Sequence, residues 1–306
     1  MLKGCEQVKK VISISLGSSK RDHFAEIELM GKEFQISRIG TDGDLGKMVS
    51  YIRENDGKVD AFGLGGIDLY LQAVDRRYSL RDAEKVANAA KLTPIVDGSG
   101  LKNTLERRVV QHLLEETDIL SGRKKALIVS AMDRCGLAQS LSEAGCEMGY
   151  GDVAFVLNLP ILLKSLNTLA FIARLLVPII RLLPFSMIYP TGKKQEKNEP
   201  RYPKYFLDAD LIAGDFHFIR RFMPERLPGK IIITNTVTES DLSMLRDKGV
   251  RTLITTTPEI EGRSFGTNVM EALLVAYTGN KGELKDEEYL LLLKELDFRP
   301  RIVQLQ

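Results

Sequence analysis

The sequence predicts an α/β fold, with an N-terminal α/β domain followed by a Rossmann-like, doubly wound domain that carries a helical apolar insertion. Three observations support this prediction. Short apolar runs alternate with helical patterns along the chain, which is typical of mostly parallel sheets. The pattern restarts after a short basic linker, Ser121–Lys125. A chain of 306 residues also suggests about two domains of roughly 150 residues each. We therefore expect domains at residues 1–122 and 123–306.

Composition indicates a globular protein with a real core, since 44% of the residues are apolar and 27% charged. A net charge of +2 is too small to indicate a nucleic-acid partner, and the sequence holds no motif for one. Cys5, Cys135 and Cys146 lack metal-site spacing, so we expect free thiols in a reducing compartment and no metal. The first ten residues contain no apolar signal region. We therefore expect a cytoplasmic location.

The first domain follows from its apolar periodicity. The Met30–Lys32 turn joins two alternating runs into a hairpin. Leu45, Met48 and Ile52 share one face of a helix. The expected strands are Val11–Leu16, Phe24–Leu29, Phe34–Ile39, Val59–Leu64 and Pro94–Val96, and the expected helices are Asp44–Glu54, Leu80–Ala90 and Asn103–Glu116.

The second domain repeats this alternation. Ala126–Asp152 reads as a strand, a turn, a helix and a second strand, and later strands come near the ends of helix-like segments. The expected strands are Ala126–Ser130, Leu211–Ala213, Lys230–Thr234 and Thr252–Thr256, and the expected helices are Gly136–Ala144, Asn268–Thr278 and Asp286–Leu296.

An insertion over residues 153–204 interrupts the rhythm. Val153–Tyr189 is heavily apolar and carries only Lys164, Arg174 and Arg181 as charged residues. The uncharged runs fall short of the roughly 18 residues that a spanning helix needs. Two interpretations stay open: a buried helical hairpin or dimer interface, and an amphipathic element at a membrane surface. Thr191–Lys204 is basic and rich in proline, which predicts an exposed loop.

The turn after Ala126–Ser130 is the candidate for cofactor binding. A dinucleotide fingerprint has G-x-G-x-x-G here, and this chain has Ala131, Asp133 and Gly136. Asp133 would repel a pyrophosphate, a charge that Arg134 could offset. Asp152 stands 21 residues after Ala131, the distance of the acid that accepts from a ribose hydroxyl. We expect NAD or NADP here, and an ordinary strand-to-helix turn is the alternative.

Small and polar residues also follow the later strands, where open parallel sheets bind their ligands. His217 is a candidate general acid or base, because imidazole titrates near neutral pH, or else a structural or surface histidine. The segment before Asn268 could bind an anion through free backbone amides, or supply only a helix cap. The further residues expected at the cofactor are Gly214, Thr234, Asn235, Thr236, Thr256 and Gly266, with Arg263 expected at the substrate.

Three loops of the first domain complete the predicted site. If its sheet is parallel, they gather at one edge, and a small hydroxylated or carboxylated substrate could bind there. Lys102 and Asp97 are the candidate acid/base pair, since a lysine beside a carboxylate can shuttle a hydroxyl proton. Tight structural turns are the alternative. The expected substrate contacts are Ser18, Ser19, Lys20, Gly65, Gly66 and Ser99.

The two-domain layout resembles the quinate 5-dehydrogenase-like proteins of the shikimate/quinate dehydrogenase type. The segment Gly40–Gly46 (GTDGDLG) is similar to an Asn-Thr-Asp-Gly element of that family, with Asp42 as the acid. The resemblance implies NAD(P)-linked oxidation of a cyclic polyol acid.

We therefore expect an NAD(P)-dependent oxidoreductase acting on a small polar hydroxy or keto acid, and a homodimer. Two alternatives remain. One is a non-redox binding protein or transferase for a phosphorylated ligand. The other is an enzyme on an acyl or isoprenoid substrate that uses the apolar insertion as its channel.

Overall fold

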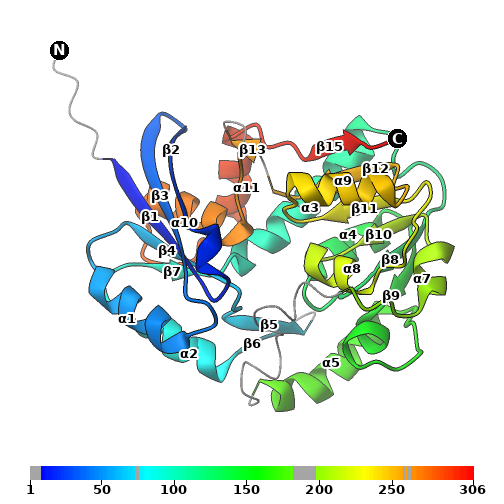
Figure 1. Cartoon of the computed structure of the whole chain (residues 1–306), viewed down its shortest axis with the longest axis horizontal. Helices are drawn as coiled ribbons and strands as arrows, with labels where there is room; N and C mark the ends of the chain where they lie inside the picture. The colour runs from blue at the N-terminus through cyan, green and yellow to red at the C-terminus, as the bar shows by residue number, and fades with distance from the viewer. Residues whose placement is uncertain (1–7, 74–75, 182–197, 258, 261–262) are drawn as a thin grey trace.

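Two lobes, each built around its own β-sheet, make up the protein (Figure 1). The computed structural model describes residues 8–73, 76–181, 198–257, 259–260 and 263–306. The first sheet has the order β2-β3-β1-β4-β7, parallel except for β2 at its edge. Its strands are β1 (Lys9–Ser15), β2 (His23–Leu29), β3 (Lys32–Gly40), β4 (Ala61–Gly65) and β7 (Ile95–Val96).

Helices cover both faces of the first sheet. Ile14 and Phe62 point to one face and pack with α1 (Leu45–Asn55) and α2 (Arg81–Ala87). Helix α1 starts where the Asp44 carboxylate accepts the backbone N–H of Lys47. The other face carries Val11 and Ala61 and belongs to a cluster that continues into the second lobe.

The second sheet has the order β15-β12-β11-β10-β8-β9 and is parallel except for β15. The chain runs from β8 outward to β9 and then returns to the opposite side of β8 for β10. This reversal between β8 and β10 is the topological switch point, where doubly wound sheets bind their ligands. The strands are β8 (Lys125–Ile128), β9 (Glu147–Tyr150), β10 (Leu211–Ala213), β11 (Ile231–Thr234), β12 (Thr252–Thr255) and β15 (Arg301–Gln304).

Helices also cover both faces of this second sheet. One face packs with α7 (Pro203–Asp208), α8 (Phe216–Phe222) and α9 (Glu239–Asp247). The opposite face packs with α4 (Cys135–Glu143) and α11 (Asp286–Glu295). The predicted Rossmann-like, doubly wound arrangement is therefore confirmed.

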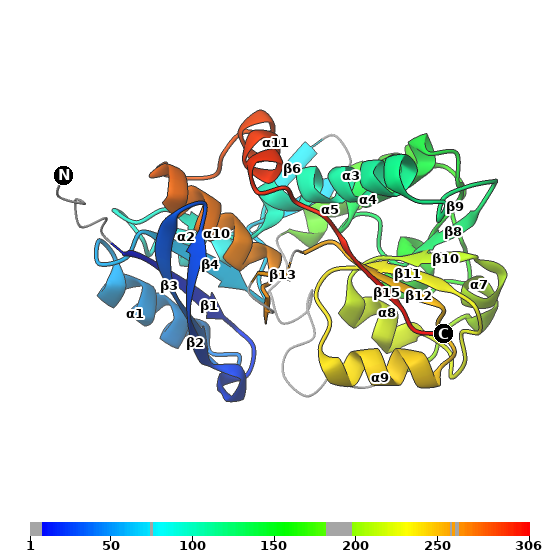
Figure 2. The ribbon, with the colours of Figure 1, turned by 90° about the horizontal axis from the view of Figure 1, so that it is seen from above.

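Two helices tie the lobes together. Helix α3 (Ser99–Glu116) leaves the first lobe and packs against α4, α10 and α11. Helix α10 (Thr267–Thr278) follows the last parallel strand of the second sheet but lies on β1 and β4 of the first (Figure 2). The C-terminal half of the sequence thus supplies part of the first lobe. The domain boundary at residue 122 stays a prediction.

The return of α10 explains two glycines of the first lobe, Gly63 inside β4 and Gly98 just after β7. A Cβ on Gly63 would lie 2.6 Å from the carbonyl oxygen of Asn268, and one on Gly98 would lie 2.7 Å from its nitrogen. Gly98 also has φ +92°, a conformation that favours glycine. These glycines therefore admit the first turn of α10.

Each predicted strand and helix is present, with ends shifted by a few residues. Helix α3 starts at Ser99 rather than Asn103. The sequence interpretation missed a hairpin between β4 and α2, and it missed α9 and the antiparallel edge strand β15. The hairpin consists of β5 (Tyr70–Ala73) and β6 (Arg76–Ser79).

The apolar insertion begins with η2 (Asp152–Val156), a single π-helical turn, and continues into α5 (Leu166–Ile180). Leu169, Ala173 and Val177 are buried on one face of α5, whereas Phe171 and Leu175 on another face are exposed. Among the described helices, none has the length and apolarity to cross a membrane. Residues 182–197, which include parts of the predicted apolar segment and loop, lie outside the described residues.

A candidate ligand-binding site between the two lobes

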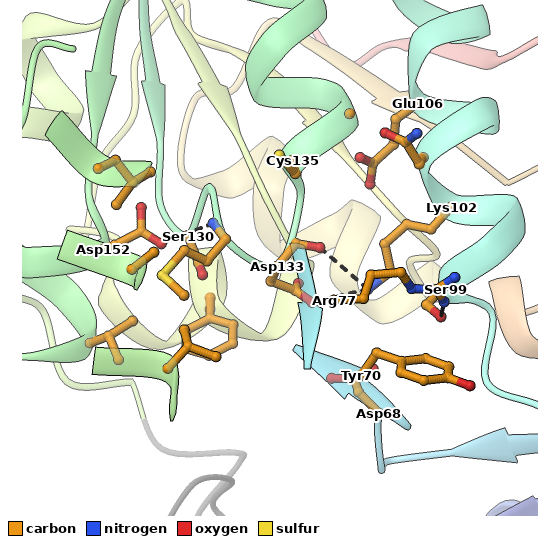
Figure 3. Close-up of a pocket in the computed structure, with 18 of the residues that line it drawn as sticks. Asp68, Tyr70, Arg77, Ser99, Lys102, Glu106, Ser130, Asp133, Cys135 and Asp152 are labelled. Atoms are coloured by element: carbon orange, nitrogen blue, oxygen red, sulfur yellow. Dashed lines mark hydrogen bonds and ion pairs between the residues drawn. The ribbon is translucent and has the colours of Figure 1, made fainter. Parts of the chain in front are cut away.

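A cavity of about 370 Å³ lies at the switch point, between the start of α3, the β8–α4 loop and the apolar insertion. Its volume is within the range of small-molecule sites. Figure 3 shows side chains from both lobes converging on it. One wall is charged and the other is apolar, and the two are built from different parts of the chain.

The charged wall centres on Lys102 and Asp133, whose side chains point toward each other (Figure 3). The Lys102 Nζ atom lies 3.0 Å from Asp133 Oδ1 and also donates to the Asp133 carbonyl at 3.3 Å. Burial alone would raise the pKa of Asp133, but the charges of Lys102 and Arg134 outweigh it and lower the pKa to about 2. Burial opposes the charge on Lys102, yet Asp133 raises the pKa of that lysine. Both groups are therefore ionised at neutral pH.

Arg134 extends this pair into a buried network. Its guanidinium contacts Asp133 at 3.2 Å, Glu106 at 3.0 Å and Asp215 at 2.7 Å. Burial disfavours the charged guanidinium, but the surrounding carboxylates raise the pKa of Arg134. The arginine thus bridges α3 and the loops after β8 and β10. A planar guanidinium is suited to this because its donors form a rigid fork.

The carboxylate of Glu106 binds at the N-terminus of α4. One of its carboxylate oxygens accepts the backbone N–H of Leu137 at 3.0 Å, and the other accepts from Arg134. Burial raises the pKa of Glu106, against the lowering effect of Arg134. A helix N-terminus attracts anions, and here the anion is the protein's own carboxylate.

Asp152 lies on the cavity wall and holds the β8–α4 loop. Its two oxygens accept the backbone N–H groups of Ala131 and Met132, each at 3.0 Å. Burial raises the pKa of Asp152 to about 6, although these hydrogen bonds lower it. This carboxyl group therefore titrates closer to neutral pH than an ordinary aspartate does.

The β5–β6 hairpin borders the charged wall. Arg77 forms an ion pair with Glu283 at 2.8 Å, donates to Ser99 Oγ at 2.8 Å and lies 4.2 Å from the Tyr70 ring centroid. These contacts join the hairpin to the start of α3 and to the segment before α11. They place an aromatic face beside the polar end of the cavity.

The apolar wall comes from the insertion. Helix α5 presents Ile172, Leu176 and Val177 to the cavity, and η2 presents Val153 and Val156. The hydrophobic contacts of α5 include Met132 in the β8–α4 loop. An apolar group of a ligand would lose water on this side.

The residues present do not fit a dinucleotide held by the usual pyrophosphate cradle. The N–H groups of Ala131, Met132 and Leu137, which would face a phosphate, already donate to Asp152 and Glu106. Asp133 adds a further ionised carboxylate. Gly136 is required for a different reason, because a Cβ there would lie 2.6 Å from Asn103 Oδ1 on α3.

Four residues predicted from the sequence meet at this cavity: Lys102, Ser99, Gly136 and Asp152. The expected pairing of Lys102 with Asp97 is wrong, because the carboxylate that contacts Lys102 is Asp133. Asp97 instead accepts the backbone N–H groups of Leu69 and Ser99, at 2.5 and 2.9 Å. Its role is therefore to hold two loops together.

The polar residues after β10 and β11 bond mainly to one another. Asn235 accepts from the backbone of Phe216 and donates to Asp215. The Thr234 hydroxyl donates to the Gly214 carbonyl at 2.8 Å. The Gly214 φ of +144° is a conformation that L side chains rarely adopt.

The cofactor and acid/base residues expected around these strand ends are not among the described residues that line the cavity. Thr236 contacts Thr257, and His217 is exposed on α8. The Thr256 hydroxyl is buried without a hydrogen-bond partner in the described part of the chain. The described lining of the cavity does not include the following predicted residues: Ala131, Arg134, Gly214, His217, Thr234, Asn235, Thr236, Thr256 and Gly266.

The other residues predicted at the substrate also have their own structural partners or positions. Ser19 donates through its backbone and its hydroxyl to Asp42, at 2.9 and 2.8 Å. The described cavity wall does not include Ser18, Ser19, Lys20, Gly65 or Gly66. Arg263 lies in the short strand β14 (Arg263–Ser264).

Sequence reasoning missed several residues of the cavity. Glu106 and Arg77 were not singled out, because their importance depends on contacts across the fold. Asp133 was noticed only as an obstacle to phosphate binding. The signal available in the sequence was the neighbouring Arg134, because an acidic and a basic residue side by side in a loop can form an ion pair.

Comparison with known proteins gives two family matches. Residues 100–305 match the model of Domain of unknown function (DUF8754), and residues 10–97 match that of Domain of unknown function (DUF8753). A search of curated proteins found no match.

Several solved structures resemble most of the chain at low identity. L-tryptophan dehydrogenase from Nostoc punctiforme is 13% identical over 95% of this chain and 79% of its own, with a TM-score of 0.38. The NAD-dependent malic enzyme from Thermotoga maritima is 13% identical over 94% and 76%, with a TM-score of 0.37. A galactofuranose-binding protein is 12% identical over 95% and 100%, with a TM-score of 0.38.

Proposed function

The chain belongs to the family described as Domain of unknown function (DUF8754), and we propose that it binds a small amphipathic molecule in the cavity between its lobes. The observation that carries this proposal is the two-sided lining of the cavity. Ionised side chains of α3 and the β8–α4 loop form one wall, and α5 and η2 form an apolar one. Apolar surfaces with a few placed polar groups are typical of small-molecule sites.

The charges of the cavity favour a ligand whose polar end is neutral or cationic. Its acidic residues outnumber its basic ones, which are Arg77 and Lys102. A carboxylate or pyrophosphate would enter against this excess. We therefore propose a hydroxyl, amide or amine as the polar end, in place of the hydroxy or keto acid expected from the sequence. The acidic side chains are those of Asp68, Glu106, Asp133, Asp152, Glu283 and Asp286.

Asp152 is the group that we propose for proton transfer. A pKa of about 6 lets this carboxyl exchange a proton near neutral pH. Each of its oxygens holds one backbone N–H and retains a further lone pair for a ligand. Lys102 would instead orient the polar end as a fixed positive charge, because Asp133 keeps it protonated.

An NAD(P)-dependent oxidoreductase is the second candidate function. The strand order supports it, because the cavity lies at the switch point where doubly wound sheets bind nucleotides. The carboxylates of Asp152 and Glu106 on the loop amides argue against it. The two candidates therefore differ in whether a dinucleotide binds.

Ligand titration of the purified full chain separates them. We would measure thermal shift and intrinsic tyrosine fluorescence with medium-chain and isoprenoid alcohols and amines, with the matching carboxylates, and with NADH and NADPH. We expect the alcohols or amines to bind more tightly than the carboxylates. Tight binding of NADH or NADPH with no response to the amphipathic compounds would overturn the first proposal and support the second.

A matched pair of variants locates the binding. Ile172→Glu puts a charge on the apolar wall, whereas Leu175→Glu puts one on the exposed side of the same helix. We expect Ile172→Glu to weaken binding at least tenfold and Leu175→Glu to leave it unchanged. Equal effects of the two variants would show that the ligand binds elsewhere.

A further inference from the structure

The outer side of the insertion exposes an unusual concentration of large apolar side chains. Val156, Leu157, Leu159, Ile161, Phe171 and Leu175 are each 42–62% exposed, and we call them the insertion face. They make up six of the thirteen large apolar side chains exposed in the described part of the chain, within about twenty residues of sequence. Exposed apolar side chains gathered in one segment are typical of an interaction site.

The insertion face is continuous with the cavity wall. Val156 and Leu157 line the cavity and are also exposed to solvent. Helix α5 separates the two surfaces, since Ala173 is buried toward the cavity and Phe171 and Leu175 lie on the exposed face. Residues four apart share one helix face, which explains why Phe171 and Leu175 lie together.

The charges around this face have one sign. From Val153 to Arg181, the sequence contains Lys164, Arg174 and Arg181 and no acidic residue. Lys164 and Arg174 are exposed. A second copy of the chain docking on this face by two-fold symmetry would bring like charges together. An anionic lipid surface offers both the opposite charge and an apolar layer.

We propose that the insertion face docks on anionic membranes as an interfacial element. Helix α5 has 15 residues and therefore measures about 22 Å, shorter than the roughly 30 Å core of a bilayer. Phe171 and Leu175 would enter the boundary between headgroups and acyl chains, while Lys164 contacts the lipid phosphates. Phe171 and Leu175 do not belong to the described lining of the cavity, so this inference does not depend on which ligand the cavity binds.

Vesicle co-sedimentation of the full chain tests the proposal without any cavity ligand. The probes are vesicles of phosphatidylcholine alone and of phosphatidylcholine mixed with phosphatidylglycerol. We expect binding to the mixed vesicles, weakened by salt because the charges are exposed. We expect the double variant Phe171→Glu/Leu175→Glu to lose at least tenfold in vesicle affinity.

Helix α11 provides the matched control. Leu290 and Leu291 are also exposed leucines, at 47% and 67%, so Leu290→Glu/Leu291→Glu makes the same chemical change elsewhere. We expect this control to bind like the unmodified chain. Absence of vesicle binding, or an equal loss in both double variants, would overturn the proposal. So would a dimer in analytical ultracentrifugation that Phe171→Glu/Leu175→Glu dissociates, since a second copy would then be the occupant.

Discussion

In each lobe another part of the protein approaches the backbone near the ends of the parallel strands, but the two lobes accommodate this approach in different ways. In the first lobe, Gly63 and Gly98 leave room for the backbone of Asn268 as α10 arrives. In the second lobe, the loop after β8 lacks two fingerprint glycines, and the carboxylates of Asp152 and Glu106 approach its amides instead. The backbone of the first lobe is approached by a helix, and the loop of the second lobe is approached by side chains.

This difference shows what a glycine near a strand end can indicate. It marks a close approach of some group to the backbone, but that group can be another part of the same protein. In this chain Gly63 and Gly98 face α10, whereas the candidate ligand cavity borders the glycine-poor loop after β8. Carboxylates nevertheless serve both regions, because Glu271 on α10 accepts the Gly98 N–H at 2.5 Å.

The largest effect is expected from breaking the second-lobe network at Arg134. Arg134→Met would leave Glu106 and Asp215 without their buried cation, and we expect a loss of about 3–5 kcal/mol in the free energy of unfolding. Urea denaturation measures it. Arg299→Met, which removes an exposed ion pair with Asp297, is the control and should change stability little. Equal stability of the two variants would mean that the network does not hold the loop.

A smaller loss is expected from filling the first-lobe gap. Gly63→Ala places a Cβ 2.6 Å from the Asn268 carbonyl oxygen, so α10 must shift, at a cost of about 1–3 kcal/mol. Gly282→Ala is the control, because its Cβ would meet nothing within 4 Å and its φ is not positive. Urea midpoints of both variants give the comparison. An unchanged midpoint for Gly63→Ala would show that α10 packs less closely than described.

Glu271 predicts a pH dependence for the first-lobe contact. Burial raises the pKa of Glu271 to about 8, so the folded state holds a proton that the unfolded chain releases near its ordinary pKa of 4.5. This contribution to the free energy of unfolding is complete below about pH 4.5 and is lost as the pH rises through 8, at up to about 1.4 kcal/mol per pH unit. Glu271→Gln should flatten this part of the stability profile, measured by urea denaturation from pH 5 to 9. A profile identical to that of the unmodified chain would contradict the raised pKa.

The smallest effect is expected from restoring a fingerprint glycine. Ala131→Gly should lower stability by about 0.4–1 kcal/mol, because the unfolded chain gains conformational freedom. It should not create binding of NADH or NADPH, since Asp152 and Glu106 still occupy the loop amides. Fluorescence titration with both dinucleotides checks this. Micromolar binding in the variant would show that the missing glycine, and not the carboxylates, was the obstacle.

Much of the fold could be predicted because it depends on local periodicity. Alternating apolar runs located each parallel strand, and amphipathic spacing located helices such as α1 and α4. The hairpin β5–β6 was missed because its second strand contains the adjacent charges Arg76 and Arg77, which break the alternation. The position of α10 on the first sheet could not be read locally, since its apolar pattern suits either sheet.

The site was predicted in part for the same reason. Lys102 and Asp152 follow strand ends, where ligands of parallel sheets gather, so position alone was enough to select them. Their partners depend on long-range packing. Glu106 contacts Arg134 across 28 residues, and Arg77 contacts Glu283 across 206. Sequence spacing carries no signal for such pairs.

The return of α10 has a consequence for the newly made chain. The first lobe's strands are complete by Val96, but the helix that covers β1 and β4 begins at Thr267, about 170 residues later. At 5–20 residues per second, a ribosome needs roughly ten to thirty seconds to make that stretch. During this interval one apolar face of the nascent sheet lacks α10, the period in which a chaperone would have most to shield.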